Sequence, residues 1–179
     1  MNKKLTILVV TVLSVFVLML SILSTNTDKT HIKPIELNNT DLIHNRTNVS
    51  YYDTIISVGL EKLNIEEHVI VKNLPEHMLP NNGNLEVKAL IYPQNNYYVI
   101  RIIPQKTKKE SLRILSHELI HLRQYVNKEI VIDNENRVFW KGKEFIINPE
   151  NYYNRPWEDE AFRLQDSLGK VISEEIFYK

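Results

Sequence analysis

The first hydrophobic stretch of the chain runs without a charged residue from Leu5 to Leu23. As a helix, these 19 residues would span roughly 28 Å, close to the hydrocarbon thickness of a bilayer. A cleaved signal peptide usually has a shorter apolar stretch that ends at a small-x-small site, and no clear site of this kind follows here. Residues 1–24 are therefore predicted to form an N-terminal signal anchor, with a removed signal peptide as the alternative. Lys3 and Lys4 favour a cytoplasmic N-terminus and an extracytoplasmic remainder, which would be secreted if the segment is cleaved.

Hydrophobic periodicity almost disappears in residues 25–50, which are rich in Asn and Thr. This composition predicts a polar tether between the membrane and a folded domain. Its two histidines, His31 and His44, are predicted to be solvated. The folded domain is predicted to occupy residues 51–179.

From residue 51 onward, successive segments of the chain show apolar residues spaced either as in a helix or as in a strand. The predicted elements are a helix over 51–64, a strand over 67–72, a hairpin of strands 85–92 and 97–103, a helix over 107–126, a strand over 129–132, a second hairpin of strands 137–140 and 144–147, and a helix that starts near Pro156 and reaches residue 170. This order predicts a small α+β domain, with a mostly antiparallel sheet packed on the second helix and on a C-terminal helix. His68 and His77 are predicted to be surface or loop residues.

Composition narrows the range of functions. Lys and Arg together number 22, as do Asp and Glu, so the formal net charge is zero and no nucleic-acid partner is expected. The chain has no cysteine, which excludes disulfides, cysteine zinc sites and thiol nucleophiles.

The helix predicted over 107–126 carries the strongest chemical signal. Thr107 and Glu110 have the spacing of a capping box, which marks a helix start. Leucines then recur at helical spacing, and His117, Glu118 and His121 fall on the adjacent flank of the helix. The flank therefore carries an H-E-x-x-H pattern beside an apolar stripe.

H-E-x-x-H is a pattern suited to zinc chemistry. Side chains at i and i+4 lie on one helix face, so His117 and His121 can bind a single Zn²⁺ ion. Glu118 can reach a water at that ion without being a ligand, as a general base requires. A catalytic zinc site uses three protein ligands, and no histidine follows His121. The remaining candidates are carboxylates, of which Glu158 and Glu160 are the best placed.

With these two motifs the chain resembles the zincin metallopeptidases whose third ligand is a glutamate on a later helix. The matching residues are His117–His121, with Gln124 just beyond, and Glu158–Ala161. The resemblance implies a zincin-like domain that hydrolyses a peptide or protein substrate, with His117, His121 and Glu158 as zinc ligands and Glu118 as the base. Phe162 departs from the pattern, because that position often holds the Asp or Asn that orients a ligand histidine.

Several alternatives stay open. Glu160 could replace Glu158 as the third ligand, and Tyr125, Tyr152, Tyr153 or Arg155 could stabilise an oxyanion. The chain could instead be a non-catalytic, membrane-anchored zinc-binding or interaction module. In the last alternative the motif is accidental and the chain is a membrane-anchored α+β adaptor.

Overall fold

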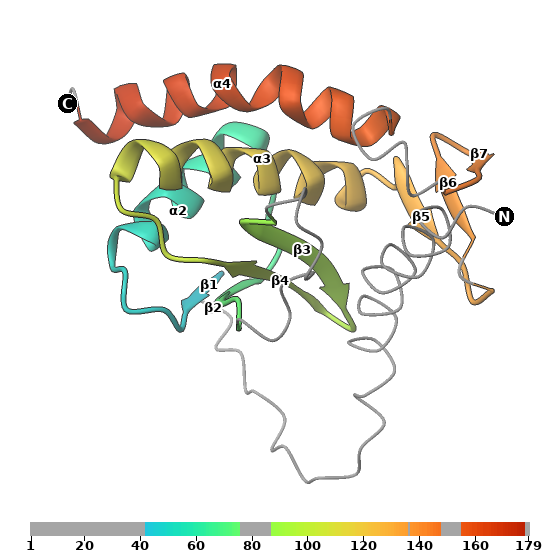
Figure 1. The fold of residues 1–179 in the computed structure, drawn as a ribbon, viewed down its shortest axis with the longest axis horizontal. Helices are drawn as coiled ribbons and strands as arrows, with labels where there is room; N and C mark the ends of the chain where they lie inside the picture. Colours follow the sequence, from blue (N-terminus) through green and yellow to red (C-terminus); the bar gives the residue numbers. More distant parts are fainter. Residues whose placement is uncertain (1–41, 76–86, 136, 148–154, 178–179) are drawn as a thin grey trace, which may run out of the picture. The chain divides into compact units, whose positions relative to one another are not determined.

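The structure is a computed structural model that describes residues 42–75, 87–135, 137–147 and 155–177 (Figure 1). The predicted anchor and most of the predicted tether lie outside the described residues. Within the described ranges no helix is long and apolar enough to cross a membrane. Nearly all of the described elements belong to one compact unit formed by residues 41–74 and 88–179.

The larger sheet contains β1 (Ile43–Asn45), β2 (Val69–Asn73), β3 (Ala89–Gln94) and β4 (Tyr97–Ile102), in the order β1-β2-β4-β3. β3 and β4 form the predicted antiparallel hairpin, but β2 is parallel to both β1 and β4. The sheet is therefore mixed, and the prediction of a mostly antiparallel sheet was wrong for the sheet that packs on the helices. A hairpin turn sets the direction of its own two strands only, so periodicity could not show how the hairpin would join β2.

β1 lies within the segment predicted as a tether. The strand pairs with β2 along its whole length, and Val69 N–H donates to the Leu42 carbonyl at 2.7 Å. The Asn45 side chain then closes a turn by donating to the Val49 carbonyl at 2.9 Å. The described fold therefore already includes β1 and does not begin at Tyr51. The sequence did not indicate this strand, because three residues are too few to show alternation.

Three helices lie on one side of this sheet: α2 (Tyr51–Leu63), α3 (Lys108–Val126) and α4 (Pro156–Phe177). α3 packs against α2, α4 and β3, and α4 runs along the far side of α3 from the sheet (Figure 1). The predicted cap of α3 is confirmed, since Glu110 N–H donates to Thr107 Oγ1 at 3.2 Å. The main core lies between these layers and contains buried side chains from all three helices and from β2, β3 and β4. The structure is thus an α+β domain, as predicted.

Small residues allow the helices to approach closely. A Cβ atom on Gly59 of α2 would lie 2.4 Å from Cδ1 of Leu119 of α3, which is inside any normal contact. On α4, Ala161 is fully buried. Its small side chain suits the close packing of α4 on α3.

A second, smaller sheet contains β5 (Ile130–Ile132), β6 (Val138–Trp140) and β7 (Lys143–Phe145), all antiparallel. The β6–β7 turn consists of Lys141 and Gly142, whose φ angles of 48° and 79° are those of a tight hairpin turn. This sheet lies in the chain between α3 and α4, and its aromatic side chains contact the start of α4. It therefore helps to hold the first turn of α4.

Candidate metal centre

His117 and His121 of α3 and Glu158 of α4 converge on one point. The two Nε2 atoms are 3.1 Å apart, and each lies 3.4 Å from Glu158 Oε2. All three residues are at least nine-tenths buried. In the described part of the chain they are the group of His, Cys, Asp and Glu side chains that could hold a metal ion.

The local sequence explains this convergence. His117 and His121 are one helical turn apart on α3, so their rings project from the same face. Pro156, which suits the first turn of a helix, starts α4, and Glu158 lies in that first turn. Since α4 packs along α3, a side chain from its first turn can reach the two imidazoles.

The geometry of the three atoms fits a tetrahedral cation. Zinc–ligand bonds of about 2.0–2.1 Å at tetrahedral angles place neighbouring ligand atoms about 3.3 Å apart. The observed separations are 3.1, 3.4 and 3.4 Å. Glu158 Oε2 is buried, and beside its ion-pair contacts with the two imidazoles it accepts no hydrogen bond in the described structure. A cation among the three atoms would satisfy this oxygen and both nitrogen lone pairs.

The buried side chains of this group shift one another's pKa values. Burial alone would raise the pKa of Glu158, but the imidazoles of His117 and His121 outweigh it and lower the pKa to about 2. Burial alone would lower the pKa of His121, but Glu158 and Glu118 raise it to about 9. Without a metal, the group therefore holds a carboxylate next to an imidazolium.

Glu118 is also buried, beside the two histidines. Burial raises its pKa above the ordinary range of a glutamate, and the negative charge of Glu158 adds to this, while His121 and His117 oppose it. A raised pKa makes the carboxylate a stronger base.

The ring of His121 is held by Gln124. The Gln124 amide nitrogen donates to the Trp157 carbonyl at 3.0 Å and to Glu160 Oε2 at 2.9 Å. The amide oxygen therefore faces His121 Nδ1, at 2.7 Å, and accepts a hydrogen bond from it. With its proton on Nδ1, His121 presents the lone pair of Nε2 to the candidate metal position.

The partner of His117 is arranged differently. The Gln165 amide lies 3.1 Å from Nδ1 of His117. With its oxygen toward the ring, the amide nitrogen faces the Arg113 guanidinium, donor against donor, so only the turned-over orientation satisfies both ends of the amide. With oxygen toward the ring, Gln165 accepts from Nδ1. Turned over, its nitrogen donates to Nδ1 and its oxygen accepts from Arg113 at 3.1 and 3.2 Å. A metal ion on Nε2 requires the first orientation, because Nδ1 then carries the proton.

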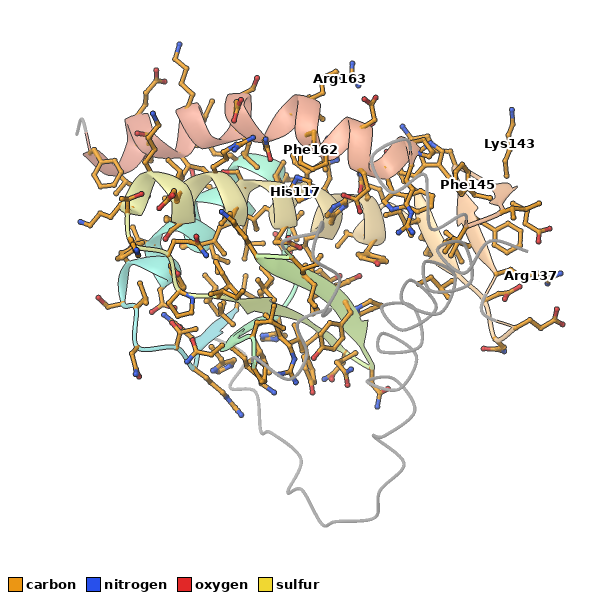
Figure 2. All side chains as sticks on the ribbon, in the orientation of Figure 1. His117, Arg137, Lys143, Phe145, Phe162 and Arg163 are labelled. Carbon is orange, nitrogen blue, oxygen red and sulfur yellow. The ribbon has the colours of Figure 1, made fainter. Side chains whose placement is uncertain are left out.

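Phe162 lies against His117, with the ring centroids 4.6 Å apart (Figure 2). It provides no acceptor for the histidine, as its departure from the zincin pattern suggested. Gln165 contacts Nδ1 of His117 from one turn further along α4. Sequence reasoning missed Gln165, although its spacing of seven residues from Glu158 places both side chains on the same face of α4.

Glu160, the alternative third ligand, does not belong to the group. Its carboxylate accepts hydrogen bonds from Arg123 and Gln124 and, at 3.2 Å, from Lys141. Of the two acidic candidates, the structure brings Glu158 to the histidines and turns Glu160 toward these donors.

The other predicted candidates are distributed as follows. Burial raises the pKa of Tyr125, and the negative charges of Glu158 and Glu118 raise it further. The Tyr125 hydroxyl therefore stays protonated. Arg155 lies 6.0 Å from the ring centroid of Trp157. Tyr152, Tyr153, His31 and His77 lie outside the described residues. His44 and His68 are described but lie outside the group.

Comparisons of the chain with protein-family models, with curated proteins and with solved structures gave no match.

Proposed function

We propose that the chain is a zinc-dependent metallopeptidase, in which His117, His121 and Glu158 hold the zinc ion and Glu118 is the general base. One observation carries this proposal: two imidazole nitrogens and a carboxylate oxygen from separate helices lie 3.1–3.4 Å apart, the spacing of ligands around tetrahedral zinc. The α+β architecture, with α3 between a sheet and a second helix, is compatible with a zincin-like domain.

A zinc ion at this position would lower the pKa of a water molecule toward 7 and polarise a substrate carbonyl. Glu118 accepts the proton of the attacking water and can pass it to the leaving amine. Its burial beside the histidines supports this role, because a carboxylate with a raised pKa accepts a proton more readily. A purely structural zinc site has no need of a carboxylate there.

A peptide substrate is inferred from the resemblance to zincins, and one feature of the sheet supports it. β3 is an outer strand of the larger sheet and packs against α3. Its edge away from β4 pairs with no other described strand, and Pro93 within it lacks an N–H group, as is common at sheet edges. An extended peptide could pair with this edge, on a strand that packs against the helix carrying the histidines.

We further propose that the N-terminal segment anchors the domain in a membrane, with the domain outside the cytoplasm. This part of the proposal rests on the apolar run Leu5–Leu23 and the lysines before it. If the segment is cleaved, the same domain is secreted.

Glu118→Gln in the full chain, purified in detergent, tests the proposed function. We expect wild type and variant to bind one zinc ion each, and the variant to lose about 10²–10⁴-fold in hydrolysis of a peptide library, because only the base is removed. Glu174→Gln on α4 is a matched control with the same change of charge, and it should keep full activity. Glu174 lies on the exposed side of that helix, where its described ion pair is with Lys170.

The alternatives give different results. Bound metal without hydrolysis, and no effect of Glu118→Gln, would support the non-catalytic zinc-binding module. Absence of bound metal from the wild-type chain would make the H-E-x-x-H pattern accidental.

A further inference from the structure

Glu160 links three parts of the fold around the candidate metal centre. Its Oε2 atom accepts hydrogen bonds from Arg123 and from Gln124 of α3, and its Oε1 atom accepts one from Lys141 in the β6–β7 turn at 3.2 Å. The side chain is largely buried, so these contacts are shielded from competing water. Glu160 is therefore held in one position from two sides.

This position determines the orientation of Gln124. If the Gln124 amide turned over, its oxygen would face the Glu160 carboxylate at 2.9 Å and the Trp157 carbonyl at 3.0 Å. Both contacts would then join two acceptors, which is unfavourable in a buried site. The amide nitrogen must therefore point toward α4 and the amide oxygen toward His121.

We propose that Glu160 is a positioning residue for the metal centre, acting through Gln124 on His121. Glu160 and the Trp157 carbonyl fix the Gln124 amide, the amide oxygen binds the proton on Nδ1 of His121, and Nε2 is left free for the metal. The first turn of α4 thus supplies one ligand, Glu158, and also sets the orientation of a second. This inference rests on the proposed zinc centre and gives a role to a carboxylate that is not a ligand.

The two histidines differ in this respect. The orientation that satisfies both ends of the Gln165 amide turns its oxygen to Arg113 and its nitrogen to Nδ1 of His117, so it does not hold a proton on that atom. Gln165 therefore does not fix its histidine as Gln124 fixes His121. Removing the amide of Gln124 should cost more metal affinity than removing that of Gln165.

A double-mutant cycle tests the proposal. Zinc and cobalt affinities of the full chain in detergent are measured by competition with a chelator for wild type, Glu160→Met, Gln124→Leu and the double variant. We expect each single variant to bind zinc about 10–100-fold more weakly, the usual effect of losing an orienting partner. The double variant should lose no more than Gln124→Leu alone, because Glu160 acts through Gln124.

Two further variants separate positioning from general stability. Glu160→Gln keeps an acceptor for Gln124 and should restore most of the affinity. Lys141→Met removes another partner of Glu160 without changing Gln124, and it should leave affinity within about threefold of wild type. Thermal unfolding of each metal-free variant shows whether it is folded. If Glu160→Met does not fold, Glu160→Thr, whose hydroxyl lies too close to the backbone to reach Gln124, takes its place in the cycle.

The outcomes distinguish this inference from the proposed function. If the wild-type chain binds no zinc, the proposed function fails and this inference fails with it. If wild type binds zinc and Glu160→Met binds it equally well, only the positioning role is overturned. An additive loss in the double variant would also overturn it, because Glu160 would then act independently of Gln124.

Discussion

Binding of zinc to the metal-free protein should release a proton from His121. Burial alone would lower the pKa of this imidazole, but the neighbouring carboxylates of Glu158 and Glu118 raise it to about 9. At neutral pH the metal-free ring therefore carries a proton on both nitrogens. Since a metal ion binds the lone pair of Nε2, the proton on that atom must leave.

The size of the effect follows from the pKa. At pH 7, two units below a pKa of about 9, roughly 100 protonated rings exist for each neutral one. The apparent zinc affinity should thus be about 100-fold weaker at pH 7 than on a plateau above pH 9, and should rise about tenfold per pH unit between pH 7 and 8.5. An ordinary histidine, with a pKa near 6.5, would produce almost no slope in that range.

Isothermal titration calorimetry of the full chain in detergent measures both quantities. Titrations in two buffers with different ionisation enthalpies give the number of protons released, which should be about one or more at pH 7.5. Glu158→Gln is the informative control. It removes a proposed ligand, so the affinity should be weaker, and it lowers the pKa of His121, so the dependence of the affinity on pH above 7 should be flatter. Zinc binding that releases no proton, with the same affinity at pH 7 and 8.5, would refute this account of the site.

The same pair of charges sets a pH window for the metal-free protein. The folded pKa of Glu158 is lowered to about 2, so its contribution to stability is present above pH 4.5 and is lost as the pH falls toward 2. The folded pKa of His121 is raised to about 9, so its contribution is present below pH 6.5 and is lost as the pH rises toward 9. Thermal unfolding in the presence of a chelator should therefore show greatest stability between about pH 4.5 and 6.5. Zinc should move the maximum to higher pH.

Two substitutions away from the metal centre test the packing and the charges of the fold. Gly59→Ala should destabilise the protein by about 1 kcal/mol, because overpacking against the buried Leu119 costs about 1–3 kcal/mol and the gain in helix propensity returns about 1 kcal/mol. Chemical denaturation measures this, and an unchanged or higher stability would mean that Leu119 moves aside without cost. Lys72→Met should raise the melting temperature, since burial, Arg46 and Arg101 lower the pKa of this lysine and its charge therefore opposes folding. Because Lys72 is still partly exposed to solvent, the gain should be a few tenths of a kcal/mol and should shrink at high salt, and a lower melting temperature would contradict it.

Much of the secondary structure could be predicted from the sequence because the signals are local. Thr107 and Glu110 marked the start of α3, and alternation marked the β3–β4 hairpin. β1 was missed, since three residues within a polar segment give no pattern and the strand exists only because β2 provides its partner. The parallel pairing of β2 with β4 was also missed, because it depends on contacts between residues far apart in the chain.

In the candidate site, too, the residues that share one helix could be predicted and the contacts between helices could not. His117 and His121 share a helix, so their spacing alone placed their side chains together. The choice of Glu158 over Glu160 could not be made from spacing, since both lie in the first two turns of α4 and helix rotation decides which one faces α3. Gln165 was missed for a related reason: in the sequence it is an ordinary polar residue, and only the packing of α4 on α3 brings it to His117.

The smaller sheet has no candidate ligand in the described structure, yet its side chains contact the first turn of α4. The Trp157 ring packs edge-on against Phe145 at 5.0 Å and lies 6.3 Å from Trp140, so strands β6 and β7 contact the residue that immediately precedes Glu158. The turn between these strands supplies Lys141, which binds Glu160 two residues further on. Contacts on both sides of Glu158 therefore oppose a rotation of α4, because such a rotation would break the aromatic packing and the ion pair together. We expect this support to keep the Glu158 carboxylate facing the imidazoles, as a metal site formed before the metal binds would require.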